Sequence, residues 1–337
     1  MAACGGIADL TLDAARRSPD FEVAAIQDVD EEALHRTGDR AGIHRRHQRF
    51  EDLLTGDIDF IIINSPNHMH LEQVSLAAAG GKHCLVQKPM ARTLAEAREM
   101  VEIAADHGIK LGVTMFELGK PVHHQVKAMV QSGWLGAPTL IQACSAHDIY
   151  LRDPPEPGNW RRDPEKVGGG AFIQLAVHQI NLAAWILEKD ILSVSTTATR
   201  GRTVFEDETT VATALFRDGP TAHFAASYAA DLYAFSICGT RGRIHLFPGH
   251  LILRSDQPFK GEIFDYSRPG RETVIPLESL QESIGGMQDA VEIHAMFARW
   301  LLDRAAFPCT GECAVKDMTV LDAVYRSGKE GKCIHIS

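Results

Sequence analysis

Apolar segments alternate with helical segments along the first third of the chain, and this rhythm restricts the fold more than any other feature. The segment "IDFIIINSP" (58–66) is apolar and closed by Ser-Pro, which is typical of a strand buried on both faces. Helices are predicted at 70–81 and at 93–108, where a threonine precedes the apolar pattern and a glycine ends it. Further strands are predicted at 21–28, 82–87 and 109–116. This order predicts a doubly wound parallel sheet covered by helices on both faces.

The rhythm changes after about residue 120. One helix follows, and then come short β-rich segments joined by tight turns, which predict a mainly antiparallel sheet. Two helical patterns interrupt or close it, at 169–189 and 289–307. We therefore predict a dinucleotide-binding domain over residues 1–118 and an α+β domain over residues 119–337, which binds substrate and forms oligomers.

The net charge and the cysteines indicate which classes of partner this chain has. The chain has 337 residues and a formal net charge of −10, which argues against a nucleic-acid or anionic-membrane partner. No secretory signal pattern is seen at the start, and no membrane partner is predicted. The 7 cysteines stand singly, with no CxxC pair, which favours a reduced, cytoplasmic protein and predicts no metal site.

The first residues have the pattern of a phosphate-binding turn. Ala3–Ala8 matches G-x-G-x-x-A with alanine in the first position, and small residues there let the backbone approach a pyrophosphate. Asp28 closes the next predicted strand, where a carboxylate accepts hydrogen bonds from the adenosine ribose. Val29 and Asp30 follow, with no nearby arginine to bind a 2′-phosphate, so NAD is predicted over NADP. The alternative is an ordinary glycine turn beside a solvated aspartate.

A proline follows the lysine at the end of the strand predicted at 82–87. Pro89 fixes its own φ and drives Lys88 toward an extended conformation. A lysine held at the carboxyl end of a parallel strand lies where such sheets bind ligands, whereas a lysine in a solvated flank would have no such role.

Together these segments resemble the Gfo/Idh/MocA family of nicotinamide-dependent oxidoreductases, over essentially the whole chain. The matching stretches are "ACGGIA", "NSPNHMH" (64–70), "GGKHCLVQKPMA" (80–91), "GWLGAP" (133–138), "GGGAFIQLAVHQINLAAWIL" (168–187) and "VLDAVYRSGKEGKCIHI" (320–336). The resemblance implies a Rossmann-type first domain, a nicotinamide cofactor and a homodimer or homotetramer.

The resemblance also implies site residues. Lys88 stands at the lysine of the family's E-K-P pattern, which contacts substrate and nicotinamide, and His178 stands at the histidine of D-x-x-x-H-x-x-D, the proton acceptor. Gln174 and Asn181 flank that histidine at helical spacing and would face the substrate. The residues expected to contact the cofactor are Cys4, Gly5, Gly6, Ile7, Asp28, Asn64, Ser65, Pro66, His70, Gln87 and Lys88.

Three carboxylates of the family pattern are amides in this chain. Gln87 replaces the glutamate of E-K-P, and Gln174 and Asn181 replace the two aspartates. An amide keeps the shape and the hydrogen bonds but removes a charge, so Lys88 and His178 should lose protons more easily. The replacements suit either a general base, an anionic substrate, or a chain that has stopped catalysing.

The segment 147–170, rich in proline, arginine and aromatics, precedes the histidine helix. Trp160 is suited to pack on the apolar face of a sugar, and Arg161 or Arg162 to bind a hydroxyl or carboxylate. An ordinary surface loop with charged flanks explains the composition equally well.

These observations predict an NAD-dependent dehydrogenase that interconverts a secondary alcohol and a ketone of a sugar, cyclitol or related polyol. A family member that uses NAD transiently, as in glycoside hydrolysis, is one alternative. A catalytically idle, cofactor-binding sensor or partner protein is another.

The first strand of the sheet is expected to be largely missing. Only Met1 and Ala2 precede the phosphate turn, whereas a strand needs about five residues. We expect at most a stub of strand at residues 1–4 and weakened NAD binding. A start assigned too late explains this, and so does a natural chain with a crippled nucleotide domain.

Overall fold

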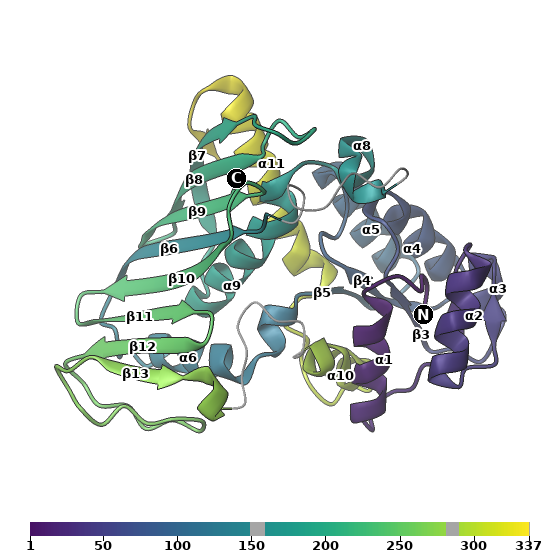
Figure 1. The fold of residues 1–337 in the computed structure, drawn as a ribbon, viewed down its shortest axis with the longest axis horizontal. Helices are drawn as coiled ribbons and strands as arrows, with labels where there is room; N and C mark the ends of the chain where they lie inside the picture. Colours follow the sequence, from purple (N-terminus) through teal and green to yellow (C-terminus); the bar gives the residue numbers. More distant parts are fainter. Residues whose placement is uncertain (149–158, 281–289, 337) are drawn as a thin grey trace. The chain divides into compact units, whose positions relative to one another are not determined.

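The computed structural model describes residues 1–148, 159–280 and 290–336 (Figure 1). They form two compact units. The first comprises Met1–Gly119, Glu165–Gly168 and the described part of Met287–Met318. The second comprises the described parts of Lys120–Pro164, Gly169–Gly286 and Thr319–Ser337.

The first unit contains a parallel sheet. Strands β3 (Phe60–Ile63), β4 (His83–Gln87) and β5 (Leu111–Thr114) pair in that order, and β1 (Ile26–Gln27) pairs with β2 (Arg46–His47). Ala2 forms parallel bridges to Gln27 and Ile63, and so lies between β1 and β3. Every residue of β5 is buried, which requires cover on both faces because successive side chains point to opposite sides. The predicted doubly wound sheet is confirmed.

Helices connect these strands, and side-chain caps set where two of them begin. The helices of the first unit are α1 (Ala8–Arg17), α2 (Glu31–Ala41), α3 (Phe50–Leu53), α4 (His70–Ala79), α5 (Leu94–Asp106) and α10 (Ala290–Leu301). Asp30 caps α2 by accepting from the N–H groups of Glu32 and Ala33, and Thr93 caps α5 by accepting from Glu96 N–H. Thr93 therefore begins the helix predicted at 93–108, as expected.

The segment 21–28 differs from its prediction. A full strand is expected there, but only Ile26 and Gln27 are paired as β1. The reason is the lack of a partner on one side. Among the described residues, only Met1 and Ala3 exchange backbone hydrogen bonds with this segment on the side of β3, so no ladder forms beside residues 21–24.

The expected stub of the first strand is present. Ala2 N–H donates to Ile62 O at 2.8 Å, and Ala3 N–H donates to Gln27 O at 2.8 Å. The single bridging residue thus joins β1 and β3 into one sheet, as the prediction of a largely missing first strand requires.

The second unit is built on a nine-stranded sheet with the order β13-β12-β11-β10-β6-β9-β8-β7-β14. Only β6 and β9 pair in parallel, so the predicted, mainly antiparallel sheet is confirmed. The strands are β6 (Pro138–Ala146), β7 (Ile191–Thr199), β8 (Thr209–Phe216), β9 (Thr221–Ser227), β10 (Leu232–Gly239), β11 (Gly242–Phe247), β12 (His250–Ser255), β13 (Thr273–Pro276) and β14 (Ile334–His335).

Helices α6 (Pro121–Gln131) and α9 (Val177–Leu187) pack against each other, and α9 also contacts β6 (Figure 1). The helical stretch Pro164–Leu187 is long and apolar enough to cross a membrane by length and composition, but most of it is buried, as in a core helix. Helices α8 (Pro164–Val167) and α11 (Gly311–Glu330) contain residues of both units.

Residues 290–318 return to the first unit, far along the chain from the rest of it. Helix α10 packs against α1, and Thr11 Oγ1 lies 3.3 Å from His294 Nε2. Val113 N–H donates to Cys309 O at 2.9 Å, which ties β5 to the same return segment. The domain boundary after residue 118 stays a prediction, and the structure adds these later residues to the amino-terminal unit.

Candidate functional site

The turn before α1 forms an open cradle of backbone. Gly5 and Gly6 are exposed, and a Cβ added to either would meet no atom within 4 Å. Ala8 N–H donates to Gly5 O at 2.9 Å, and the residue before α1, the half-buried Ile7, makes no side-chain cap. Free space beside glycines at an uncapped helix N-terminus is the geometry that a pyrophosphate needs. The residues present therefore fit a dinucleotide.

Ala3 carries the strain of this turn. Its φ is +67°, in the left-handed region where a side chain is unfavourable and where glycine is preferred. The alanine that replaces the first glycine of the pattern thus keeps the glycine conformation.

Asp28 is bound to the phosphate turn itself. Cys4 N–H donates to Asp28 Oδ2 at 2.6 Å, and Asp30 N–H donates to Oδ1 at 2.9 Å. The carboxylate is half-buried, so these bonds fix its orientation while leaving it partly accessible. Burial raises the pKa of the Cys4 thiol to about 11, so Cys4 contributes its backbone and not a thiolate.

Amide side chains meet at the carboxyl ends of β3 and β4. Gln87 Nε2 donates to Asn64 Oδ1 at 3.3 Å, and Asn64 Nδ2 donates to Thr11 Oγ1 at 3.1 Å. A glutamate at position 87 has no N–H to donate to Asn64. The amide at position 87 therefore fits its neighbours in this chain.

His70 lies beneath the two loops that follow β3 and β4. The imidazole is fully buried, with Nε2 2.9 Å from Ser65 O and Nδ1 3.0 Å from Met90 O. Burial lowers the pKa of His70, so the ring is neutral near pH 7 and donates to one of these carbonyls. His70 therefore supports the loop of Ser65 and Pro66 and the loop of Lys88, which sequence reasoning did not predict.

The same region positions the remaining predicted cofactor residues. Ser65 is buried and its hydroxyl donates to Gln73 Oε1 at 2.6 Å, so its side chain faces the interior. Pro66 is half-buried and immediately precedes the short 3₁₀ turn Asn67–Met69. Lys88 directly follows β4, is half-buried, and is joined to Pro89 by a cis peptide bond.

The histidine helix begins with a π-helical turn. Residues Phe172–Ala176, which include Gln174, are π-helical, and α9 continues with His178 and Asn181. The sequence predicts one regular helix here, whereas the structure has a wider, π-helical turn at its start. His178 and Gln174 are half-buried and Asn181 is buried. Such π-bulges are frequent at functional sites.

Two side chains that sequence reasoning missed hold the start of this helix. Asp207 Oδ2 accepts hydrogen bonds from Tyr325 Oη at 2.9 Å and from Phe172 N–H at 3.2 Å, and Ile173 N–H donates to Tyr325 Oη at 3.2 Å. Gly170 is pressed against this carboxylate, because a Cβ there would lie 2.3 Å from Asp207 Oδ1. The only sequence signal was Tyr325, inside the last stretch that resembles the family.

Trp160 and Arg161 form a stacked pair. The guanidinium of Arg161 lies 4.7 Å from the centre of the Trp160 ring, and Asn159 Oδ1 accepts from Arg161 N–H at 3.1 Å. One face of the indole is thus covered by its neighbour. Residues 149–158 of the predicted substrate loop lie outside the described residues.

The structure therefore gathers the predicted residues into groups within each unit. In the first unit, Cys4 is hydrogen-bonded to Asp28, and Asn64 is hydrogen-bonded to Gln87. His70 lies under the loop that contains Lys88. In the second unit, Gln174, His178 and Asn181 share one helical stretch, which Asp207 holds at its start.

Comparison with known proteins gives matches over both parts of the chain. The family described as "Oxidoreductase family, NAD-binding Rossmann fold" matches residues 1–115, and the "GFO/IDH/MocA C-terminal domain" matches residues 123–245.

Named relatives and a solved structure are similar to this chain over most of its length. The chain is 28% identical over 288 residues to a 1,5-anhydro-D-fructose reductase from Ensifer adhaerens, covering 83% of this chain and 80% of that protein. It is 26% identical over 295 residues to a D-xylose 1-dehydrogenase [NADP(+)] from Haloarcula marismortui, covering 86% and 78%. A levoglucosan dehydrogenase in complex with NADH and levoglucosan has the same fold, with a TM-score of 0.87, 19% identity, and coverage of 99% and 98%.

Proposed function

Because the chain belongs to the Gfo/Idh/MocA oxidoreductase family and its amino-terminal domain is an NAD-binding Rossmann domain, we propose that it is an NAD-dependent sugar dehydrogenase. It would interconvert a secondary alcohol and a ketone or lactone of a sugar, anhydrosugar or related polyol. The proposed use of NAD is supported above all by the open glycine turn before α1. Asp28 accepts a hydrogen bond from Cys4 N–H in that turn. The substrate class is supported by relatives named for anhydrofructose and xylose.

In the proposed reaction the cofactor supplies the hydride acceptor, and this chain's residues hold the substrate and move its proton. His178 accepts the hydroxyl proton, since an imidazole changes protonation near neutral pH. Lys88 stabilises negative charge on the substrate oxygen as the carbon–hydrogen bond breaks. Gln174 and Asn181 orient the substrate through amide hydrogen bonds, and Trp160 with Arg161 contacts it from the loop.

Two substitutions test this assignment. Lys88→Ala and His178→Ala should each reduce turnover about 100-fold or more, which is the typical effect of a lost acid–base group. NAD affinity, measured by fluorescence titration, should stay within a few-fold of the original. Lys260→Ala and His44→Ala, which change exposed side chains of the same types, serve as matched controls. Near-normal turnover in either test variant would remove that residue from the mechanism.

A second candidate is a cofactor-binding sensor without turnover. The observation that favours it is the replacement of three family carboxylates by amides, at positions 87, 174 and 181. Restoring the charges in the triple variant Gln87→Glu, Gln174→Asp, Asn181→Asp tests it. Turnover only in that variant would favour the sensor, whereas turnover in the original chain would favour the dehydrogenase.

We also propose that the protein is a homodimer or homotetramer that assembles through the sheet of the second unit. On β8, alternate residues are buried, and Val211 and Leu215 are 42% and 44% exposed. Apolar side chains on an open sheet face are suited to a second copy. In light scattering, Val211→Asp should lower the assembled mass, and a monomer at all concentrations of the original chain would contradict the proposal.

We propose a reduced, cytoplasmic location, which is supported by the seven cysteines of the sequence, none of them joined in a disulfide. Fractionation of cells that carry the tagged chain checks it.

The net charge of −10 supports a small-molecule partner over a nucleic acid.

A further inference from the structure

The residues just before the histidine helix belong to the nucleotide-binding unit. Glu165–Gly168 is part of that unit, and the second unit resumes at Gly169. We call Glu165–Gly168 the linking segment. It is far in sequence from the loops that follow β3 and β4, yet hydrogen bonds hold it against both loops.

One of these bonds comes from the loop that follows β3. Asn67 Nδ2 donates to Val167 O at 2.8 Å, and both residues are buried. Asn67 directly follows Pro66, one of the residues expected to contact the cofactor. His70 joins this loop to the loop that follows β4. A hydrogen bond buried at both ends fixes the main chain at Val167, since breaking it would leave two desolvated polar groups.

Arg92, in the loop that follows β4, makes the other contacts. Its Nη1 donates to Glu165 O at 3.2 Å. Glu96 of α5 orients Arg92 by accepting from its Nε and from its backbone N–H, each at 3.0 Å. Gly168 has a φ of +91°, and a Cβ there would lie 2.4 Å from Arg92 O. The linking segment therefore packs directly on the loop that begins with Lys88.

The residues after the linking segment are held as closely within the second unit. A Cβ at Gly169 would lie 2.3 Å from Tyr325 Oη, and a Cβ at Gly170 would lie 2.3 Å from Asp207 Oδ1. Both contacts are made by the side chains that hold the start of the histidine helix. The three glycines are thus needed because a different neighbour lies against each of them.

The connection between the two held points is short. Val167 is bound by Asn67, Phe172 N–H is bound by Asp207, and only residues 168–171 lie between them. A chain extends by at most about 3.3–3.6 Å per residue, and this one is packed along its length. A displacement of the loops that follow β3 and β4 therefore reaches the start of the histidine helix through the main chain.

We propose that Asn67 and Arg92 are positioning residues that couple the cofactor site to the histidine helix. The inference rests on the proposed function, in which Pro66 and Lys88, on the same two loops, contact the cofactor. Cofactor binding restricts these loops, and the linking segment passes that order to the helix that carries His178. The proton acceptor is thus fully ordered only when the nicotinamide site is filled.

Hydrogen exchange of the full chain, measured by mass spectrometry with and without saturating NAD, tests the coupling. The reporters are the amides of residues 171–174, whose N–H groups bind Asp207, Tyr325 and Gly170 at the start of the helix. In the original chain NAD should slow their exchange about fivefold or more. In Asn67→Ala this effect should fall by more than half, while NAD still slows exchange in the glycine turn before α1. Arg92→Ala, a change at a half-buried side chain, should act in the same direction.

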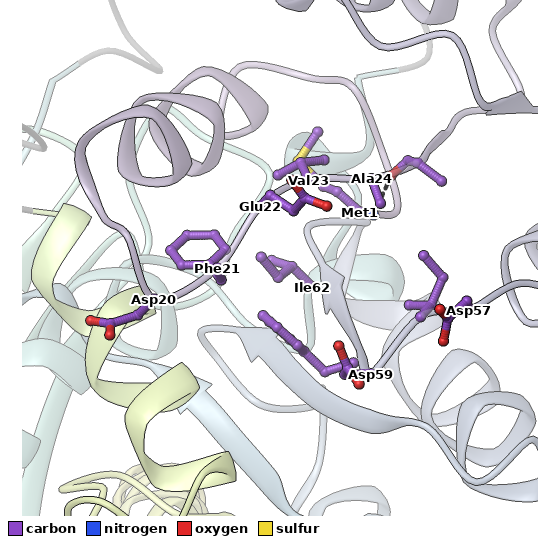
Figure 2. A pocket seen from close by; sticks show the side chains of 12 residues that line it. Met1, Asp20, Phe21, Glu22, Val23, Ala24, Asp57, Asp59 and Ile62 are labelled. Carbon is purple, nitrogen blue, oxygen red and sulfur yellow. Dashed lines mark hydrogen bonds between the residues drawn. The ribbon is translucent and has the colours of Figure 1, made fainter.

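Three variants serve as controls, and all three should keep the full effect of NAD on amides 171–174. Ser255→Ala removes another buried donor to a main-chain carbonyl, Trp134 O at 2.8 Å, outside the linking segment. Arg98→Ala removes an exposed arginine of α5. Asp59→Asn changes an exposed side chain that lines the groove at the opposite, amino end of β3 (Figure 2).

Kinetics give a second readout. Asn67→Ala should lower kcat about fivefold or more and change the KM for NAD less, because the glycine turn and Asp28 are intact. In the double variant Asn67→Ala, Asp207→Ala the loss of kcat should be smaller than the product of the two single losses, because both residues act through the same short segment. Two independent structural defects would instead multiply.

Equal slowing of amides 171–174 in Asn67→Ala and in the original chain would overturn the proposal. So would NAD that binds the original chain, as seen by fluorescence titration, and leaves these amides unchanged. Both results would leave the proposed dehydrogenase activity standing. Absence of NAD binding to the original chain would overturn the coupling and the proposed function together.

Discussion

At the scale of single residues, the phosphate turn contains a side chain in an unfavourable conformation. Ala3 has a φ of +67°, where an L-residue costs roughly 1–2 kcal/mol and glycine costs little. We predict that Ala3→Gly stabilises the protein by about 1 kcal/mol in urea unfolding, after allowance for the greater freedom of glycine in the unfolded chain. Ala105→Gly, in the exposed part of α5, is the control and should destabilise by roughly 0.5–1 kcal/mol. A destabilised Ala3→Gly variant would contradict the strained turn.

Asp28 has two tasks that substitution can separate. Its carboxylate holds Cys4 N–H, and the motif assigns it to the ribose of NAD. We predict that Asp28→Ala weakens NAD binding at least about tenfold and weakens NADP binding less, because repulsion of the 2′-phosphate is lost. Asp28→Asn retains an acceptor for Cys4 N–H, so it should change the NAD-to-NADP ratio with less loss of total affinity. Tighter binding of NADP than NAD by the original chain, in a calorimetric titration, would show that the assignment is wrong.

At the scale of elements, the start of the histidine helix depends on one buried carboxylate. Asp207 accepts from Phe172 N–H and Tyr325 Oη, so removing it leaves both donors without that acceptor. We predict that Asp207→Ala destabilises by about 1–3 kcal/mol and lowers kcat, because the helix that carries His178 loses its anchor. Asp207→Asn retains an acceptor and should recover most of both losses.

The pH dependence checks the same carboxylate. Burial raises the pKa of Asp207 above its ordinary 3.8, so the folded chain binds this proton more tightly than the unfolded chain. The contribution of Asp207 to stability should therefore fall as the pH rises from 3.8 through the folded value. That part of the pH profile should be absent in Asp207→Asn. Equal profiles for the two proteins would mean that the carboxylate is not desolvated.

The strands show which elements sequence alone can predict. The apolar run at 58–63 and the run at 82–87 form β3 and β4, because burial on both faces leaves a continuous apolar pattern. The run at 21–28 has a similar pattern, yet only two of its residues pair as β1. A pattern reports what a strand would bury, whereas pairing depends on the neighbouring strand. The π-helical turn at Gln174 was also not predicted, because side-chain spacing alone does not distinguish one wider turn.

At the scale of the whole molecule, the order of elements gave both sheets, and six matching stretches gave the family. The glycine turn before α1 and the position of Asp28 could be predicted from their local spacing in the sequence. The contacts that hold the start of the histidine helix, and the return of residues 290–318, did not follow from local spacing. Asp207 and Tyr325 are 118 positions apart, and residues 290–318 join a unit that begins at Met1. Contacts of that kind depend on tertiary packing, which no local pattern contains.

The proposed activity of this chain is hydride transfer between a sugar and NAD. The most direct measurement is transfer of deuterium from carbon-deuterated sugars, including xylose and anhydrosugars, to NAD, detected by mass spectrometry of the nicotinamide after one turnover. We predict label in the recovered cofactor with at least one sugar, and loss of that label in His178→Ala. Tight NAD binding with no label transferred from any sugar of a broad panel would contradict the proposed dehydrogenase activity and favour the sensor.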